Sequence, residues 1–353
     1  MQNNKLKIEN ICILRTSSLG DICNMLPFIY TLRSEYPNAK IFWIIGKSEA
    51  NFLRIIDGIE FIVFDRNKTI KSYISIAKQL KKISFDIMFI MQVSLRANII
   101  SLFVNAKTKL GYDSHESNNL HKFFLNKKIP IPANSHVVDV FLNFLSYLNV
   151  EKNKFVYKWD ITEKFSLNYL RDKYPDLNKK YFVLSPCSRN SNRNWLIERY
   201  ADVADYININ FGLLCVFSSS SDGYEKNFVE KIINKMNTES CNLSGKTDLH
   251  ELLSLIKNSE LLISPDSGPI HLATCVDRPV IGLYGVTNTV RAGPYKSKDL
   301  CIDKYNQALK KYYGLEPHEV RWRFKNNHRD AMSLITKNEV IKKINIFFGR
   351  SEN

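Results

Sequence analysis

Residues 15–21, RTSSLGD, combine hydroxyl groups, a glycine and a carboxylate between an apolar run, ICIL, and a segment with helical spacing of apolar residues. This pattern predicts a turn at a strand end, with Asp21 at or near the N-cap of the next helix. Asp21 has two open interpretations: a helix cap, or a general base for a substrate hydroxyl, since the helix dipole favours the charged carboxylate. The turn residues that would surround such a substrate are Thr16, Ser17, Ser18 and Gly20.

A second motif, LLISPDSGPIHLAT at residues 261–274, gives the stronger phosphate-binding signal, because RTSSLGD lacks both GxGxxG and the P-loop pattern. An apolar run ends in a turn, and a proline follows at the expected start of a helix. Amides freed at a helix N-terminus hold a diphosphate, and a histidine one turn in adds a donor. A structural role for that histidine, packed between helix and sheet, also stays open. The residues are Asp266, Ser267, Gly268 and His271.

Basic residues follow other expected strands in both halves of the chain. The loop SPCSRNSNRNW, residues 185–195, places Arg189 and Arg193 where guanidinium groups suit charge developing on a leaving diphosphate. Any one of these side chains also fits a solvated loop. In the first half the corresponding residues predict a basic rim, and they are Lys47, Arg66, Lys68 and Arg96.

The elements expected to position these side chains are strands, seen as short apolar runs, that alternate with helices, seen as segments with helical spacing of apolar residues. The runs are nearly continuous rather than alternating, as expected for parallel strands covered on both faces, and the βαβ rhythm predicts an open parallel sheet in each half. Residues 151–166 are polar and predict a linker. Strands are expected at residues 11–14, 40–46, 61–65, 85–92, 180–188, 212–219, 260–266 and 279–285. Helices are expected at residues 21–37, 49–56, 70–82, 136–150, 194–208, 223–236, 248–259, 269–276 and 331–349.

The composition favours an anionic partner in a reducing compartment. The chain has 353 residues and a net charge of +15, without a block of like charge of the kind found in nucleic-acid-binding arms. Its seven cysteines form no CxxC pair, and several lie in apolar runs, which argues against a disulfide framework or a zinc site. With no signal-peptide pattern or membrane-spanning run, we expect a cytoplasmic protein, and loose attachment to a membrane surface stays open.

The combination of motifs resembles the heptosyltransferases of lipopolysaccharide core synthesis, glycosyltransferase family 9. The resemblance rests on strand-TSSLGD-helix, on strand-PDSGPIHLA-helix, and on segments such as WIIGKSEANFL, NWLIERYADVADY and RAGPY in the expected order. It covers essentially the whole chain, and TSSLGD points to the heptosyltransferase I branch.

The resemblance implies a GT-B fold, an α/β architecture of two Rossmann-like parallel-sheet domains facing across a cleft. Residues 1–160 would bind the acceptor and residues 161–330 the nucleotide sugar, while residues 331–353 would form a helix that packs back on the first domain. The donor would be ADP-heptose, and the acceptor the 3-deoxy-manno-octulosonic acid (Kdo) region of lipid A. The acceptor's anionic groups suit the basic rim, and lipid A lies in the anionic inner leaflet, where the protein would be peripheral on the inner membrane.

The family's functional residues correspond to particular positions here. The catalytic base of inverting transfer corresponds to Asp21, and the basic residue that binds the diphosphate, usually lysine, corresponds to Arg193. The donor motif corresponds to residues 266–271. No metal or cofactor is expected, because helix amides and Arg193 take the metal's role. The remaining donor contacts implied are Ser185 and Ser188 near the phosphates, Glu225 at the ribose and Thr247 against adenine.

Three alternatives are weighed against this function. The nearest is an enzyme of the same family with another nucleotide sugar or acceptor, as in heptosyltransferase II. A catalytically inactive GT-B scaffold is disfavoured because Asp21 and both half-sites are present. A basic nucleic-acid-binding protein is remote, because the sequence lacks a helix-turn-helix, a zinc knuckle and a basic stripe.

Overall fold

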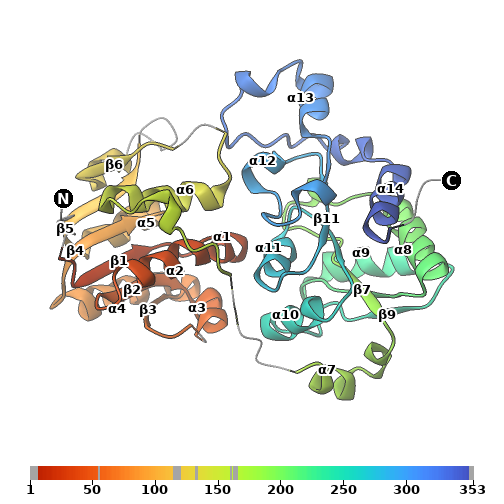
Figure 1. The fold of residues 1–353 in the computed structure, drawn as a ribbon, viewed down its shortest axis with the longest axis horizontal. Helices are drawn as coiled ribbons and strands as arrows, with labels where there is room; N and C mark the ends of the chain where they lie inside the picture. The colour runs from red at the N-terminus through yellow and green to blue at the C-terminus, as the bar shows by residue number, and fades with distance from the viewer. Residues whose placement is uncertain are drawn as a thin grey trace. The chain divides into compact units, whose positions relative to one another are not determined.

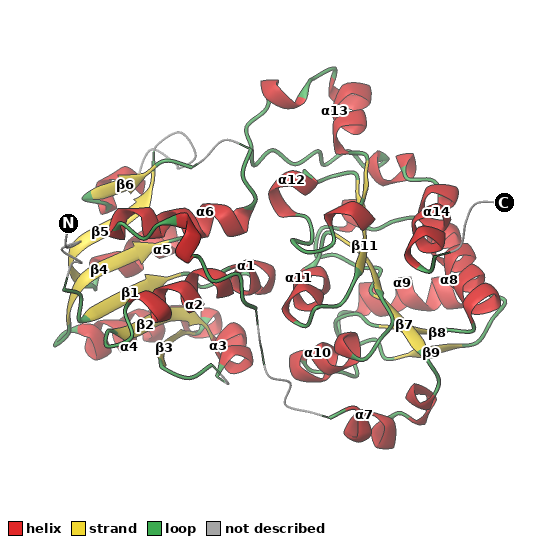
Figure 2. Cartoon of the chain, viewed as in Figure 1, coloured by secondary structure: helices red, strands yellow, loops and turns green. Residues whose placement is uncertain are grey.

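A parallel six-stranded sheet forms in each half of the chain (Figures 1 and 2). The computed structural model describes residues 7–54, 56–113, 121–131, 134–159, 161 and 166–349. The chain divides into two compact units, Met1–Ile161 and Thr162–Asn353, called unit 1 and unit 2 below. The division falls inside the polar segment for which a linker is predicted. The expected α/β class, with two parallel sheets, is confirmed.

In unit 1 the sheet has the order β3-β2-β1-β4-β5-β6, and the paired strands are parallel. Its strands are β1 (Asn10–Leu14), β2 (Lys40–Gly46), β3 (Ile59–Phe64), β4 (Ser84–Ile90), β5 (Asn105–Tyr112) and β6 (Lys127–Ile129). Its helices are α1 (Leu19–Asn24), α2 (Leu26–Glu35), α3 (Lys47–Leu53), α4 (Thr69–Leu80), α5 (Leu95–Leu102) and α6 (Val137–Asn143).

Helices cover both faces of this sheet, which explains why its central strands are apolar without alternation. On one face, buried residues of α4 and α5 join Cys12 and Leu14 of β1 in one hydrophobic cluster. On the other face, Phe28 of α2 meets Phe89 of β4 edge to face, with ring centroids 5.2 Å apart. Phe144, directly after α6, meets the same Phe89 ring, with ring centroids 6.2 Å apart.

In unit 2 the sheet has the order β12-β11-β10-β7-β8-β9, again with parallel pairs. Its strands are β7 (Tyr181–Leu184), β8 (Leu214–Phe217), β9 (Ser240–Asn242), β10 (Leu262–Pro265), β11 (Val280–Tyr284) and β12 (Ile302–Asp303). Its helices are α7 (Leu167–Lys173), α8 (Ile197–Phe211), α9 (Gly223–Ile233), α10 (Leu249–Lys257), α11 (Gly268–Cys275), α12 (Thr289–Ala292), α13 (Tyr305–Tyr313) and α14 (Lys337–Phe347).

The strand order of each sheet reverses at one place, and this determines where ligands bind. In unit 1 the reversal lies between β1 and β4, and in unit 2 it lies between β7 and β10. Connections leave in opposite directions on the two sides of such a switch point, which opens a crevice beyond the carboxyl ends of the two strands. The loops after these four strands are therefore the places for a functional site.

Four strands are not among the sequence predictions: β5, β6, β9 and β12. Strand β5, NAKTKLGY, carries lysines between its apolar residues, and β6 is a short strand at the sheet edge. Strands β9 and β12 have three and two residues and lie at the two edges of their sheet. The missed edge strands are only two or three residues long, which is too short to form an apolar run.

The terminal helix α14 packs on α8 of its own unit. The expected contact of this helix with the first domain stays a prediction. Its buried residues Val340 and Ile344 belong to the hydrophobic cluster that contains the inner face of α8. Lys337 forms an ion pair with Asp202 of α8 at 2.8 Å. An apolar stripe on α14 that matches the apolar stripe of α8 is enough to hold the helix on its own unit.

The cysteines behave as buried apolar residues. All seven are free thiols, and six of them are buried. Burial raises the pKa of the Cys187 thiol to about 12 and that of the Cys241 thiol to about 11. Within the described residues, no helix is long and apolar enough to cross a membrane, and no three His, Cys, Asp or Glu side chains are grouped so that they could hold a metal ion.

The packing of α14 predicts a contrast between two isoleucines of this helix. Ile344 is fully buried against unit 2, whereas Ile346 is 54 % exposed. We expect Ile344→Ala to lower the free energy of unfolding by about 2–5 kcal/mol, because it leaves a cavity. Ile346→Ala should change it by less than about 0.5 kcal/mol. Urea denaturation of both variants measures the difference, and equal effects would contradict the packing described.

Candidate active site

The predicted residues of unit 1 lie at the carboxyl edge of its sheet. Asp21 follows β1, Lys47 follows β2, Arg66 and Lys68 form a short 3₁₀ helix after β3, and Arg96 lies in the first turn of α5 after β4. Because the strands are parallel, these loops share one edge of the sheet. The structure therefore brings the predicted acceptor residues to one end of unit 1.

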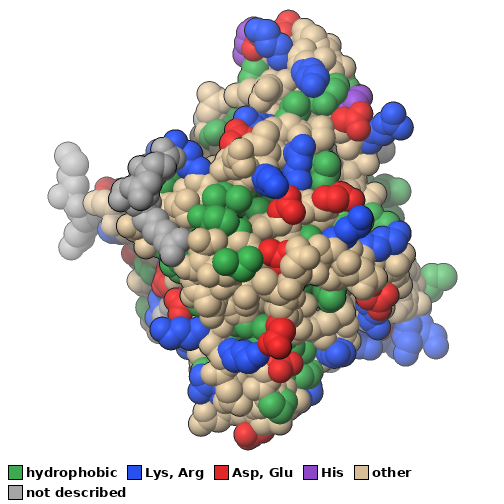
Figure 3. Space-filling model, turned by 90° about the vertical axis from the view of Figure 1, so that its right-hand side faces the viewer, with side chains coloured by type: hydrophobic (Ala, Val, Ile, Leu, Met, Phe, Trp, Pro, Cys, Tyr) green, Lys and Arg blue, Asp and Glu red, His purple; other side chains and the backbone are tan. Residues whose placement is uncertain are grey.

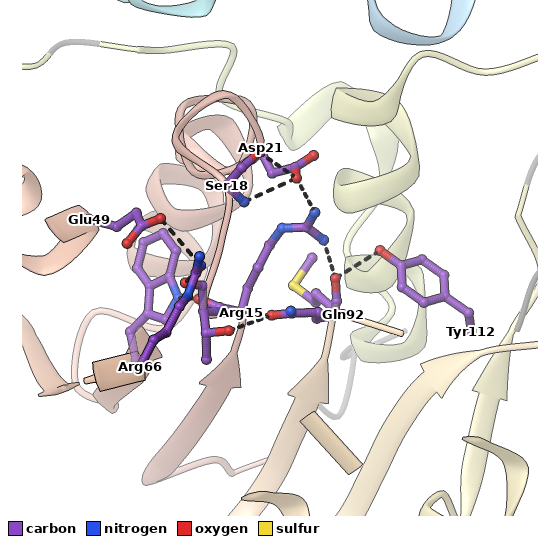
Figure 4. A network of polar contacts seen from close by, with 10 residues as sticks. Arg15, Ser18, Asp21, Glu49, Arg66, Gln92 and Tyr112 are labelled. Atoms are coloured by element: carbon purple, nitrogen blue, oxygen red, sulfur yellow. Dashed lines mark hydrogen bonds and ion pairs between the residues drawn. The ribbon is translucent and has the colours of Figure 1, made fainter. Parts of the chain in front are cut away.

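Asp21 is held within the first turn of α1 (Figure 4). It occupies the third helical position, near the N-cap as expected, and the N-cap itself is Ser18. The Ser18 amide and hydroxyl both donate to Oδ2 of Asp21 at 3.2 Å. These contacts close a capping box, which satisfies amides that a helix N-terminus otherwise leaves without partners. Asp21 therefore has the capping role that one of its two interpretations predicts. Its side chain is still 30 % exposed.

Arg15 fixes the same carboxylate oxygen and is not among the predicted site residues. Its Nη2 lies 2.6 Å from Oδ2 of Asp21, although only 12 % of the arginine side chain is exposed. The other Nη donates to the Met91 carbonyl, and the guanidinium carbon lies 4.9 Å from the centre of the Phe141 ring. Tyr112 also donates to the Met91 carbonyl, at 3.3 Å. The second oxygen of Asp21 points away from Arg15 in Figure 4.

Hydrogen bonds hold the turn after β1 to residues that follow neighbouring strands. The amide and hydroxyl of Thr16 donate to Oε1 of Gln92, which follows β4, at 2.7 and 3.0 Å. Nη2 of Arg66 donates to the Thr16 carbonyl at 3.0 Å. A Cβ on Gly46 would lie 2.5 Å from the same carbonyl, so only glycine fits at the end of β2. Thr16 and Arg66 therefore position the turn across the switch point, while Ser17 and Ser18 keep exposed surface.

The rim of unit 1 is mixed in charge rather than uniformly basic. Lys47 lies 3.5 Å from Asp65, and Nη2 of Arg66 lies 3.7 Å from Glu49. A hydrogen bond from the Asn67 amide, reinforced by Lys47, holds the pKa of Asp65 below its usual value. Two further basic residues complete the rim: Lys68, which is exposed, and Arg96, whose guanidinium lies 5.5 Å over the Phe64 ring.

The matching site of unit 2 lies between β7 and β10. Ser267 is the N-cap of α11, and the proline that follows occupies its first turn, as predicted. Nη1 of Arg193 forms an ion pair with Oδ2 of Asp266 at 2.9 Å and donates to the Asp266 carbonyl at 3.1 Å. The Ser188 hydroxyl donates to that carbonyl at 2.9 Å. The loop after β7 is thereby joined to the start of α11.

Arg193 has donor capacity that the protein does not use. Its side chain is 14 % exposed, and Nε is buried without a hydrogen-bond partner among the described residues. A second buried donor without such a partner is the Thr287 hydroxyl, shortly after β11. Buried polar groups are normally satisfied, and a polar ligand bound at this edge would satisfy these two donors. Thr287 lay in a loop whose sequence carried no charge or motif signal, so sequence reasoning missed it.

The other predicted donor residues lie at the same edge of the sheet and differ in their hydrogen bonding and burial. The Ser185 hydroxyl donates to the Ser218 carbonyl at 3.1 Å, and Oε2 of Glu225 accepts from the Ser220 amide at 2.8 Å. Both are thus part of the local structure. Arg189 is exposed, and His271 is buried in the first turns of α11. Thr247 immediately precedes Asp248, the N-cap of α10.

Two Rossmann-like parallel sheets, each with polar and charged side chains at its switch point, are the architecture of the GT-B fold. The model of glycosyltransferase family 9, the heptosyltransferases, matches residues 73–318. The chain is 36 % identical to the lipopolysaccharide core heptosyltransferase OpsX of Haemophilus influenzae, over 96 % of this chain and 98 % of that protein. The protein belongs to glycosyltransferase family 9, and the expectation of a glycosyltransferase is confirmed.

Solved structures support the same fold. The family 9 glycosyltransferase of Veillonella parvula superposes with a TM-score of 0.79 at 22 % identity, covering 98 % of this chain and 99 % of that one. The Escherichia coli heptosyltransferase WaaC with ADP gives a TM-score of 0.70 at 16 % identity, covering 96 % of this chain and 99 % of that one. At these identities the likeness concerns the fold.

The unused donors of Arg193 lead to a binding prediction. We expect Arg193→Ala to weaken ADP binding at least about tenfold, because a charge-assisted hydrogen bond to a phosphate is lost. Arg193→Lys should recover part of the affinity, since it keeps the charge without the planar donor geometry. Isothermal titration calorimetry measures both variants.

The matched control is Arg329→Ala, which removes an arginine of unit 2 that is 88 % exposed. It should leave ADP affinity unchanged. Thermal unfolding identifies any loss caused by leaving the buried Asp266 without its ion pair. Unchanged ADP affinity in a folded Arg193→Ala protein would remove Arg193 from the phosphate site.

Proposed function

We propose that the protein is an inverting heptosyltransferase that moves heptose from ADP-heptose to the Kdo region of lipid A in lipopolysaccharide inner-core synthesis. Membership of family 9 supports the reaction class, and the TSSLGD motif supports the heptosyltransferase I role. The observation that carries the mechanism is the fixed carboxylate of Asp21. It stands at the switch point of unit 1, held by Arg15 and Ser18 through one oxygen.

In this proposal Asp21 is the general base. A carboxylate oxygen takes the proton of the acceptor hydroxyl as the hydroxyl oxygen forms its bond to the anomeric carbon of heptose. The bond from that carbon to the diphosphate breaks in the same step, and ADP leaves with the electron pair. A single displacement inverts the anomeric configuration. Arg15 orients the base, because it holds Oδ2 while the other oxygen points away from it.

The start of α11 and its neighbours would bind the donor's diphosphate. The N-terminal amides of α11 and the guanidinium of Arg193 supply positive charge to an anion that gains charge as it leaves. The Thr287 hydroxyl adds a donor that other described residues leave unused. Glu225 and Thr247 would lie at the ribose and the adenine, His271 near the phosphates. Positive charge from the protein would serve where other glycosyltransferases use a metal ion.

The rim of unit 1 would receive the acceptor. Kdo carboxylates and lipid A phosphates are anionic, and the rim presents Lys47, Lys68 and Arg96 beside the turn. Lys47 already pairs with Asp65 across 3.5 Å, so it would exchange one anionic partner for another. Since lipid A lies in the inner leaflet, the enzyme would act from the cytoplasm at an anionic membrane surface.

The base role predicts the behaviour of Asp21→Asn. We expect turnover to fall about 100-fold or more, because the amide cannot accept the proton, while ADP-heptose affinity stays within about twofold. Mass spectrometry of Kdo-lipid A measures the transfer, and calorimetry measures donor binding. Asp57→Asn, at an exposed aspartate of the same unit, should transfer normally.

Turnover close to wild type in Asp21→Asn would remove Asp21 from the base role. The same assay tests the substrates. Transfer from ADP-glucose or GDP-mannose in preference to ADP-heptose would identify another donor. Transfer only to an acceptor that already carries heptose would identify a role like that of heptosyltransferase II.

The ion pair with Asp21 predicts that Arg15 is a positioning residue. Arg15→Ala should lower kcat about 100-fold with little change in the donor KM, because the carboxylate loses its fixed orientation. Arg15→Lys keeps a cation beside Oδ2 and should recover most of the rate. A loss in Arg15→Ala that Arg15→Lys does not repair, with normal thermal unfolding, would contradict a positioning role through charge.

A further inference from the structure

Large apolar side chains lie exposed on one face of unit 1. Alpha helices α4 and α5 cover this face of the sheet, and a short 3₁₀ helix at His121–Phe124 continues it. Six apolar side chains of this layer are exposed, of the thirteen large ones exposed among the described residues of the whole chain. They are named here the α4–α5 face: Ile70 (75 %), Ile74 (51 %), Leu95 (64 %), Leu102 (63 %), Phe103 (37 %) and Phe123 (73 %).

Ring contacts connect the two helices of this face. Tyr73 of α4 contacts Phe103 at the end of α5, with centroids 6.1 Å apart. Tyr73 also meets Phe64 at 5.2 Å, and the guanidinium of Arg96 lies over that Phe64 ring. Tyr73 of α4 is thus linked to both ends of α5, directly through Phe103 and indirectly through Phe64 and Arg96. Large contiguous apolar surface on a soluble domain usually marks a docking site.

The segment of the chain that contains α4 and α5 is rich in positive charge. Residues 66–112 contain nine lysines and arginines, of which Lys107 and Lys109 lie in β5, and one acidic residue, Asp86. Asp86 accepts from the amides of Glu9 and Asn10 and pairs with Lys107 at 2.8 Å, so its charge is already matched. On the face drawn in Figure 3, by contrast, basic and acidic side chains are interspersed. Local charge therefore distinguishes this layer from an ordinary lysine-rich surface.

The exposed side of α4 alternates apolar and basic residues. Lys71, Ile74 and Lys78 are all exposed and stand at helical spacing along one stripe. Ile76 and Leu80, on the opposite side of α4, are buried against the sheet. Exposed isoleucines and phenylalanines flanked by lysines are the composition that partitions into the interface of an anionic bilayer.

We propose that the α4–α5 face is the surface by which the protein lies on an anionic lipid bilayer. The inference rests on the proposed function, in which the acceptor is a membrane lipid. Ile70 follows the rim residue Lys68, and Leu95 precedes the rim residue Arg96. The apolar face thus begins where the acceptor would bind, so a headgroup reaching the rim would leave its acyl chains on the membrane side.

A second copy of the chain is a less suitable partner for this face. A two-fold symmetric contact would bring the lysines of α4 against the lysines of the other copy. Like charges placed opposite each other oppose association, whereas an anionic lipid surface attracts them. Charge complementarity therefore favours the bilayer.

The test is flotation of the full-length protein with phosphatidylcholine vesicles, with and without phosphatidylglycerol. The wild type should float mainly with the vesicles that contain phosphatidylglycerol. Two double variants, Ile70→Ser with Ile74→Ser and Lys71→Glu with Lys78→Glu, should each reduce the bound fraction at least about fivefold. The two variants remove different kinds of contact, so they test the face independently.

Matched controls come from unit 2. Ile209 and Ile346 are 71 % and 54 % exposed, which matches the isoleucines of α4, and Lys231 and Lys235 are exposed lysines. Ile209→Ser with Ile346→Ser, and Lys231→Glu with Lys235→Glu, should float like the wild type. The proposal is overturned if the wild type does not bind anionic vesicles, if the controls lose binding equally, or if Ile70→Ser with Ile74→Ser instead dissolves a dimer in analytical ultracentrifugation.

Transfer assays separate this inference from the proposed function. With Kdo-lipid A dispersed in detergent, all these variants should transfer heptose at the wild-type rate. With Kdo-lipid A in anionic vesicles, the two α4 variants should be at least about fivefold slower. A wild type that transfers heptose but ignores vesicles overturns the docking face alone. A wild type that binds vesicles but transfers no heptose overturns the proposed function alone.

Discussion

The reversal of strand order in each parallel sheet is the constraint on which the site depends. Between β1 and β4, and between β7 and β10, connections leave on opposite sides, so the carboxyl ends of two adjacent strands are open to a ligand. Thr16 and Gln92 join the loops on the two sides of the first opening. Ser188, Arg193 and Asp266 join those at the second. Each unit thus carries polar and charged side chains joined across its own switch point.

Asp21 shows how one residue can serve both interpretations that its sequence left open. As the third residue of α1, it closes a capping box with Ser18, and this role is structural. The same contacts, with Arg15, fix one oxygen of the carboxylate in place. A carboxylate that is already oriented loses little freedom when a substrate arrives, so the cap and the pair with Arg15 would contribute to the chemistry proposed for Asp21. The Asp21 carboxylate would repel a phosphate group, but it can accept a proton from a substrate hydroxyl.

Sequence could predict what depends on apolar runs and on local turn chemistry. The central strands and the turns after β1 and β10 come from such signals, and so does the proline in the first turn of α11. Short edge strands such as β12, with two residues, were missed because they are too short to form an apolar run. Gln92 was missed because its partner Thr16 lies 76 residues away in the chain. Arg15 was missed because its pair with Asp21 depends on the geometry of the turn between them, and Thr287 was missed because its loop carries no charge or motif signal. The contact of α14 with α8 was not predicted, since an apolar stripe does not specify its partner.

Anomeric analysis of the transfer product tests the central claim most directly. The protein would be incubated with ADP-heptose and purified Kdo-lipid A, and the product examined by mass spectrometry and NMR spectroscopy. The account predicts the mass increment of one heptose, joined to Kdo with the anomeric configuration inverted relative to the donor. No heptose increment, or a product that retains the donor's configuration, would contradict a single displacement with Asp21 as base.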